Sequence, residues 1–195
     1  MDRFRLWSMR IGQAIPKITP LLAAVLLCAP VLLAQNAAAS HDSDPWTPLH
    51  FLEGTWNAKT TGGIAQASTS GAYTFRRELK GHVLGRYSSA SGCKGPTDFD
   101  CSHSDLFYVY QEGPNQSLKA IYFDNEGHVI HYAITTPAAD TAIFLSEGNA
   151  PGPRFRLMYE LKNGVMEGKF QMLMPGKTEW VSYLEWSGGR KQDGQ

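Results

Sequence analysis

From residue 54 onward, apolar and polar residues alternate in short runs that end at glycine, proline or asparagine turns. In "AYTFRREL", Ala72–Leu79, two aromatic residues alternate with Thr74 and Arg76 before the run ends at Lys80-Gly81. Alternation with a period of two is typical of a strand with one buried face, and no long run here has the helical period of about 3.6. The pattern therefore predicts an all-β domain.

We predict about ten strands, because such runs recur at roughly ten-residue spacing. The expected strands are Gly54–Thr60, Ala72–Leu79, His82–Ser89, Asp105–Glu112, Ser117–Asp124, His128–Thr135, Thr141–Glu147, Arg154–Leu161, Val165–Leu173 and Thr178–Ser187. The turns "NEG" and "KNG" are strong hairpin signals. Consecutive antiparallel strands favour a single up-and-down β-barrel, because closure removes exposed strand edges. A two-sheet sandwich is the alternative.

Residues 1–39 are predicted to be a signal peptide. Its basic residues are Arg3, Arg5, Arg10 and Lys17. The uncharged run Leu21–Ala34 follows, which is shorter than the about 20 residues of a membrane span and fits the apolar region of an export signal. Small residues at Ala37 and Ala39 suit cleavage near Ala39, with an uncleaved anchor as the alternative. We then expect a flexible lead-in at 40–47, the barrel at 48–191 and a tail at 192–195, with one helical turn at Thr47–Leu52 capped by Thr47.

The charge of the remaining domain excludes some partners. The leader holds four of the 18 basic and one of the 18 acidic residues, which leaves a net charge of −3. A weakly acidic domain lacks the basic surface that binds nucleic acid or anionic membranes. We expect a periplasmic or secreted protein without a nucleic-acid partner and without stable membrane insertion after cleavage. The sequence does not fix the oligomeric state.

Two cysteines lie close together in "CKGPTDFDC". An even number of cysteines in an exported domain indicates a disulfide, here Cys93–Cys101. The alternative is a metal site made by these thiolates and His103, although tetrahedral sites usually need four ligands. Cys28 is expected to leave with the leader, because Leu27 stands where a lipoprotein signal needs a small residue.

The motifs "LHFLEGTW", "FDNEGHVIHY" and "MPGKTEWVSYLEW" carry a family resemblance. Their order resembles that of uncharacterised bacterial secreted domains with a lipocalin-like barrel, in the calycin superfamily that includes lipocalins and fatty-acid-binding proteins. The resemblance covers residues 48–191. It implies that Gly54 and Trp56 form a Gly-x-Trp start, that Trp56 closes one end of the barrel, and that Arg190 packs across its ring. Lys191 is the substitute for Arg190.

Haem-binding barrels of the nitrobindin type are more distant in this resemblance. "GTWNAKTTGG" departs from their glycine-rich "GTW-x-G" opening. His131 is the candidate axial ligand of a haem, but a lone strand histidine is more simply a surface or core residue. We therefore expect no cofactor and no metal.

The candidate ligand-binding residues are aromatic residues and arginines of the predicted strands. They are Tyr73, Phe75, Arg77, Tyr108, Tyr122, Tyr132, Arg156 and Trp180. An aromatic cavity with one or two arginines suits an apolar ligand with an acidic head group. The sequence does not determine which face of each strand points inward, and the alternative is a filled core with the arginines outside.

Catalytic motifs are not found in the sequence. Neither a nucleophile elbow nor a phosphate-binding glycine loop occurs. Asp98 and Asp100 of the cysteine loop are expected to be solvated. We therefore expect a binding protein that holds a hydrophobic or amphipathic small molecule without catalysis. The alternatives are a small-molecule isomerase or hydrolase that uses His131 or Glu167, and a ligand-free envelope interaction module that uses the loop at 88–104.

Overall fold

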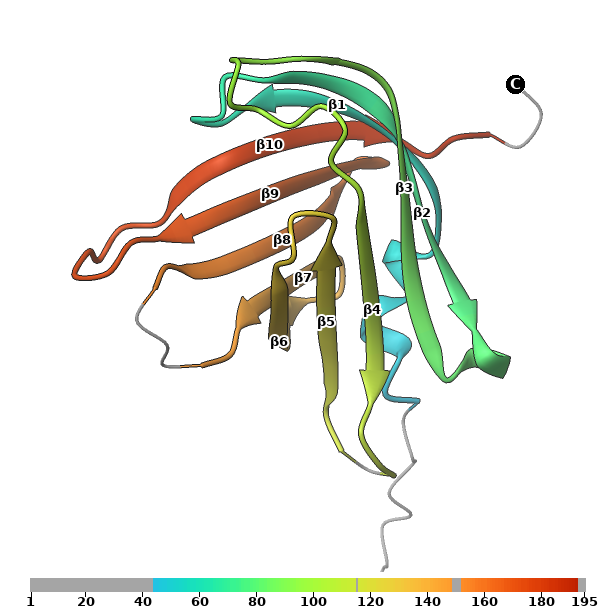
Figure 1. Cartoon of the computed structure of the whole chain (residues 1–195). Helices are drawn as coiled ribbons and strands as arrows, with labels where there is room; N and C mark the ends of the chain where they lie inside the picture. The colour runs from blue at the N-terminus through green and yellow to red at the C-terminus, as the bar shows by residue number, and fades with distance from the viewer. Residues whose placement is uncertain (1–43, 115, 149–151, 193–195) are drawn as a thin grey trace, which may run out of the picture. The chain divides into compact units, whose positions relative to one another are not determined.

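Ten strands close into one antiparallel barrel in the computed structural model, which describes residues 44–114, 116–148 and 152–192 (Figure 1). The strands are β1 (Gly54–Gly62), β2 (Ser68–Glu78), β3 (Val83–Lys94), β4 (Asp105–Gln111), β5 (Leu118–Asp124), β6 (Val129–Ala138), β7 (Thr141–Ser146), β8 (Arg154–Lys162), β9 (Val165–Leu173) and β10 (Val181–Gly189). Each strand pairs with its neighbours in the chain, and β1 also pairs with β10. The predicted fold class is confirmed.

The predicted signal peptide lies outside the described residues, as do 40–43 of the expected lead-in and 193–195 of the tail. The end of the lead-in is part of the folded domain, because Trp46 is only 8% exposed and packs with the core. The 3₁₀ helix η1 spans Thr47–Leu52, as expected. Its N-cap is Trp46 without a side-chain cap, so the predicted capping by Thr47 is wrong.

The second 3₁₀ turn, η2, spans Leu79–Gly81 and connects β2 to β3. No helix in the described ranges has the length and apolar character needed to cross a membrane. The "KNG" hairpin forms as predicted, with Asn163 at φ 52° and Gly164 at φ 79°. Positive φ at both central residues matches the right-handed twist of the strands that the turn joins.

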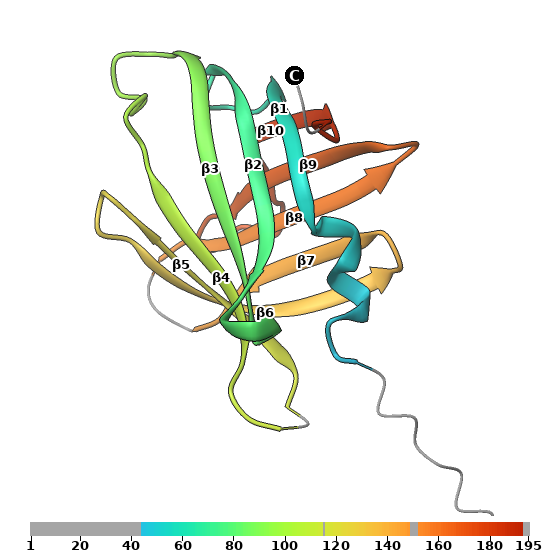
Figure 2. The same ribbon diagram turned by 90° about the vertical axis from the view of Figure 1, so that its right-hand side faces the viewer.

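The helix η1 lies at the end of the barrel away from the β3–β4 loop, residues 95–104 (Figures 1 and 2). Its Leu49 and Leu52 are buried in the same cluster as Trp56, whose ring N–H donates to the Leu52 carbonyl at 2.8 Å. Arg190 lies over the Trp56 ring, with 4.4 Å between its Cζ and the ring centroid. This end of the barrel is therefore filled by side chains.

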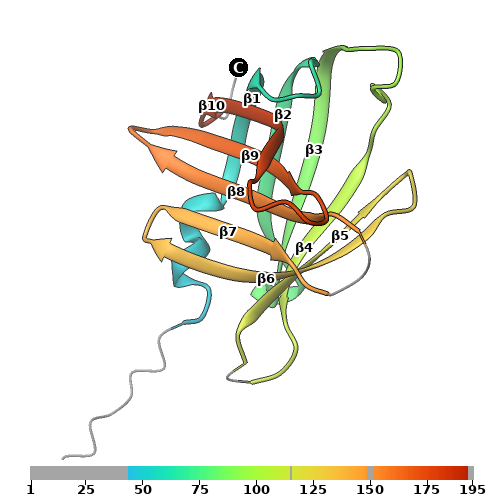
Figure 3. The same cartoon turned by 90° about the vertical axis from the view of Figure 1, so that its left-hand side faces the viewer.

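The core continues from this end as a set of edge-to-face aromatic contacts. Phe75 packs against Tyr159 at 5.3 Å between ring centroids, and Phe107 packs against Phe144 at 5.1 Å. In Figure 3, strands β6 to β9 cross in front of β2 to β4 at a steep angle. The aromatic core fills the half of the barrel near η1, and the site described next lies on the side of the β3–β4 loop.

Candidate functional site

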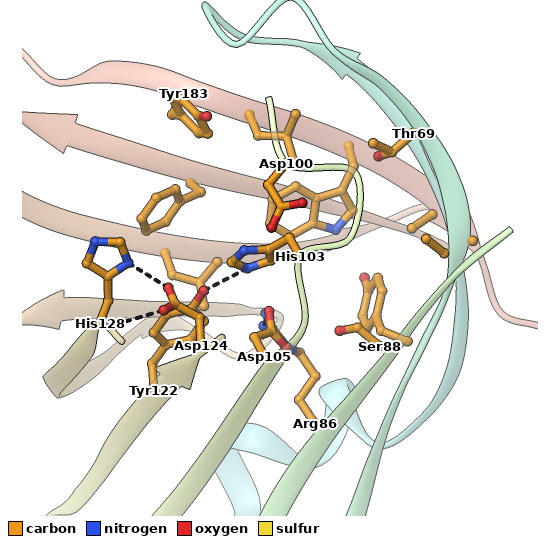
Figure 4. A pocket seen from close by; sticks show the side chains of 18 of the residues that line it. Thr69, Arg86, Ser88, Asp100, His103, Asp105, Tyr122, Asp124, His128 and Tyr183 are labelled. Carbon is orange, nitrogen blue, oxygen red and sulfur yellow. Dashed lines mark hydrogen bonds and ion pairs between the residues drawn. The ribbon is translucent and has the colours of Figure 1, made fainter. Parts of the chain in front are cut away.

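A cavity of about 540 Å³ lies inside the barrel. Residues of nine strands line it, and the β3–β4 loop contributes Phe99, Asp100 and Cys101, so the cavity opens beneath that loop (Figure 4). Small-molecule sites in proteins usually have volumes of about 300–1,000 Å³. The cavity is therefore large enough for a ligand of that kind.

One wall of the cavity is apolar and comes from β8, β9 and β10. Phe155 and Phe170 stack with 5.6 Å between ring centroids and 9° between ring planes. Leu157 continues this wall, and Trp186 of β10 adds its indole, for which Gly168 makes room because a Cβ at that position would overlap the ring. Alternate residues of each strand share a face, so the inward positions of β8 and β9 form one continuous apolar surface.

The opposite wall contains a buried ion pair. Arg86 of β3 is only 7% exposed, and its Nη2 donates to Asp105 Oδ2 at 2.5 Å. Its Nη1 donates to the hydroxyl of Tyr159 at 2.7 Å. Burial alone would lower the pKa of Arg86, but Tyr159 and Asp105 outweigh burial and raise that pKa above its usual value. Arg86 is therefore charged, and Asp105 neutralises it within the protein.

Tyrosine hydroxyls surround this pair. Burial is the main cause that raises the pKa of the hydroxyls of Tyr73, Tyr122, Tyr132 and Tyr159. The nearby indole of Trp186 acts against burial and lowers the pKa of Tyr73, although the indole N–H and the Tyr73 hydroxyl do not form a hydrogen bond. All four hydroxyls stay protonated near neutral pH and serve as uncharged hydrogen-bonding groups.

Several buried polar atoms near the pair lack hydrogen-bond partners among the described residues. They are Tyr73 Oη, Arg86 Nε, Asp105 Oδ1 and Trp186 Nε1. A buried polar atom without a partner costs about 1–3 kcal/mol, so natural cores rarely keep such atoms. Proteins tolerate unsatisfied buried polar groups mainly at their functional sites. All four residues line the cavity, so these atoms are placed to form hydrogen bonds with a bound molecule.

The mouth of the cavity holds two histidine–carboxylate contacts, and Figure 4 shows the one between His128 and Asp124. His128 Nδ1 lies 2.8 Å from Asp124 Oδ2, and the Asp124 side chain is only 4% exposed. His103 connects two further groups, with Nδ1 at 3.2 Å from Glu126 Oε1 and Nε2 at 2.9 Å from the Tyr122 hydroxyl. The β5–β6 hairpin and the β3–β4 loop are thereby joined across the opening.

The charges at the mouth are mainly negative. Hydrogen bonds from the side chain and backbone of Ser102 lower the pKa of Asp100. Burial acts to raise the pKa of Asp124, but hydrogen bonds from the backbone and ring of His128 outweigh burial, so the pKa is lowered overall. Burial raises the pKa of Tyr183, and the charges of Glu126 and Asp98 raise it further. A tyrosine at the mouth therefore experiences a negative potential.

Three residues at the mouth have the chemistry of metal ligands. Asp100, His103 and Glu126 each place one donor atom within 4.8 Å of the others. Each of them also has a hydrogen-bond partner within the protein, namely Ser102, Tyr122 and His103 itself. The cluster can attract a cation, but its side chains are also satisfied without one.

The predicted disulfide between Cys93 and Cys101 is confirmed. It lies at the edge of the cavity, and both cysteines line the opening. The alternative, in which both thiolates and His103 bind a metal, is excluded because the sulfur atoms are bonded to each other.

Five of the eight candidate ligand-binding residues lie within the barrel, but only three line the cavity. These three are Tyr73, Tyr122 and Tyr132. Phe75 is buried in the aromatic core. Arg77 lies near η1, where its Nε donates to Glu53 Oε1 at 2.8 Å and its guanidinium covers the Trp46 ring at 4.2 Å.

The other three candidates, Tyr108, Arg156 and Trp180, lie outside the barrel interior and do not line the cavity. Tyr108 points outward from β4 and packs edge-to-face on Tyr87, with 6.5 Å between ring centroids. Arg156 covers the ring of Trp180 at 4.5 Å and donates to Gln171, which faces outward on β9. A β-bulge in β10 between Ser182 and Leu184 breaks the alternation, so that Trp180 does not share the inward face of Trp186.

Sequence reasoning missed the charged residues of the site. Arg86 shares the inward face of β3 with Leu84, and Asp105 shares that of β4 with Phe107. A charge at an alternating position beside buried apolar residues was the available signal. Asp100, expected to be solvated, belongs to the lining, whereas His131 and Glu167, the residues considered for catalysis, do not. His131 is exposed, and Glu167 pairs with Lys162 at 3.3 Å.

No protein-family model matches the chain, and no curated protein matches it in sequence. The closed ten-strand antiparallel barrel is consistent with a lipocalin-like fold.

Proposed function

We propose that this chain is an exported binding protein that holds a small hydrophobic or amphipathic molecule in its barrel, without catalysing a reaction. The observation that carries the proposal is the cavity of about 540 Å³, with its stacked Phe155 and Phe170 and the ion pair of Arg86 in the opposite wall. An apolar wall with a few placed polar groups is the usual construction of a small-molecule site.

Three features support the details of the proposal. A structural disulfide is typical of proteins that fold in an oxidising compartment, which supports export. The β-meander and the packing of Arg190 over Trp56 support a lipocalin-like, calycin-type relationship. The two residues suspected of catalysis, His131 and Glu167, lie outside the cavity, which favours binding over an isomerase or hydrolase.

The cavity also bears on the third possibility, an envelope interaction module. A packed barrel without a cavity would favour that function, and a cavity of this volume counts against it. The β3–β4 loop covers the opening and contributes to its lining, so its position favours control of access to a ligand.

Native mass spectrometry tests the proposal. The full chain with its leader would be expressed for export, and the exported product would be measured before and after denaturing extraction. We expect a bound mass of a few hundred daltons that is lost on denaturation. A mass of the bare protein, with no gain after incubation with mixtures of lipids and other apolar small molecules, would contradict the proposal.

A further inference from the structure

The charges that line the cavity do not suit an anionic ligand. The expected acidic head group depended on arginines at the cavity, but Arg77 and Arg156 do not line it. The only arginine among the described lining residues is Arg86, and no described lysine belongs to the lining. The acidic residues of the lining are Asp100, Asp105, Asp124 and Glu126.

Arg86 is not free to receive an anion. Its charge is neutralised by Asp105 at 2.5 Å, and its other terminal nitrogen donates to Tyr159. Bringing a carboxylate to this pair would place two negative groups beside one guanidinium in a buried site, where charge repulsion is strong. The inner wall therefore favours an uncharged part of the ligand.

The mouth has the opposite preference. Asp100, Asp124 and Glu126 form no ion pair with a lysine or arginine in the described part of the chain, and their only basic partners are histidines. Asp124 is largely covered, but Glu126 is about half exposed, at 45%, and Asp100 lies at the rim of the opening. The negative charges of Glu126 and Asp98 both raise the pKa of Tyr183 at this rim.

Basic groups around the mouth do not cancel this charge. Lys94, the last residue of β3, is exposed and forms no ion pair among the described contacts. His103 and His128 are each engaged by a carboxylate, His103 by Glu126 at 3.2 Å and His128 by Asp124 at 2.8 Å. The mouth therefore carries carboxylates on the β3–β4 loop and the β5–β6 hairpin, close to the apolar wall of Phe155 and Phe170, and no described lysine belongs to the lining.

We propose that the ligand is an amphipathic amine whose ammonium group lies between Asp100 and Glu126 while its apolar part contacts Phe155 and Phe170. The proposal depends on the binding function proposed above and specifies its ligand class. The ammonium group is solvated at the rim and attracted by the carboxylates, and the chain or ring system displaces water from the apolar wall. The acidic mouth disfavours the carboxylate of a fatty acid.

Three probes with the same twelve-carbon chain test this assignment: dodecylammonium, dodecan-1-ol and dodecanoate. Each would displace Nile red from the full exported chain at pH 7.5, in EDTA so that no metal ion occupies the Asp100–His103–Glu126 cluster. We expect dodecylammonium to bind about tenfold more tightly than dodecanoate, with dodecan-1-ol between them. The preference should weaken as salt increases, since the rim is exposed.

The double variant Asp100→Asn/Glu126→Gln tests the proposed residues. It should remove most of the preference for dodecylammonium over dodecan-1-ol. The matched control is Glu160→Gln/Glu167→Gln, which removes two carboxylates that pair with Lys162 outside the cavity. The control should keep the preference.

Two results would overturn the inference while leaving the binding function standing. One is dodecanoate binding at least as tightly as dodecylammonium, and the other is an amine preference that survives in the Asp100→Asn/Glu126→Gln variant. If neither Nile red nor any of the three probes binds, the binding function itself fails, and the amine assignment fails with it.

Discussion

The guanidinium of Arg190 lies over the indole of Trp56, with 4.4 Å between Cζ and the ring centroid, and its Nη1 donates to the Glu53 carbonyl at 2.8 Å. The two residues are 134 positions apart in a 195-residue chain and also form an isolated β-bridge. This contact joins the end of the last strand to the start of the first, so it secures the closure of the barrel.

Replacing Arg190 by methionine should weaken this closure. Arg190→Met removes the cation–π contact and the hydrogen bond to Glu53, and we expect a loss of about 1–2 kcal/mol in the free energy of unfolding. Urea denaturation of the exported protein measures this change in the free energy of unfolding. Lys191→Met is the control, because it removes an adjacent exposed charge and should change stability by less than about 0.5 kcal/mol. Equal effects of the two substitutions would contradict the account.

Gly54 is required by the same contact. Its φ is 108°, and a Cβ at this position would overlap Arg190 Nη1. We expect Gly54→Ala to cost about 2–4 kcal/mol, from the backbone strain together with displacement of Arg190. Gly127→Ala is the matched control, because Gly127 also has positive φ, at 89°, but has open space around it. Its cost should be limited to strain, about 1–2 kcal/mol.

A double-mutant cycle separates the two causes at Gly54. If displacement of Arg190 contributes, Gly54→Ala should cost less in the Arg190→Met background than in the natural protein. An identical cost in both backgrounds would show that the contact with Arg190 does not explain the glycine.

The buried pair of Arg86 and Asp105 should be costly to break from one side. Asp105→Leu leaves a buried guanidinium with only Tyr159 as partner, and we expect a loss of about 3–5 kcal/mol. The double variant Arg86→Met/Asp105→Leu should be more stable than Asp105→Leu alone, because it removes the unpaired charge. Thermal or urea unfolding distinguishes these outcomes, and a double variant less stable than the single one would contradict the interpretation.

Asp124 should make stability depend on pH in acid. Its folded-state pKa is lowered, so its contribution is present above the unfolded pKa of about 3.9 and is lost as the pH falls through the folded pKa. We expect Asp124→Asn to reduce the loss of stability below about pH 4, measured as the unfolding free energy at successive pH values. An unchanged acid dependence in Asp124→Asn would contradict the assignment.

Most of the fold follows from local patterns in the sequence. The period-two alternation gives ten strands because one face of each strand is buried, and "KNG" gives its hairpin because Asn163 and Gly164 accept positive φ. The cysteine spacing gives the disulfide. The strand β3 runs to Lys94, beyond the predicted end at Ser89, because its pairing with β2 continues through a stretch of serine and glycine with little pattern.

The site was harder to predict because its features depend on pairs of residues far apart in the chain. β4 carries aromatic residues on both faces, so the sequence did not distinguish the inward Phe107 from the outward Tyr108. The bulge in β10 reversed the expected side of Trp180. Arg86 can be buried only because Asp105 and Tyr159 meet it, and these partners are 19 and 73 residues away.

The central claim is that a ligand enters the barrel cavity, and a fluorescence titration with Nile red tests it most directly. The titration would compare the natural protein with Leu157→Trp, which fills the cavity, and Met158→Trp, which places the same side chain outside on the same strand. We predict saturable one-to-one binding to the natural protein and to Met158→Trp, and binding at least about tenfold weaker to Leu157→Trp. Binding that Leu157→Trp leaves intact, or no saturable binding to the natural protein, would contradict the claim.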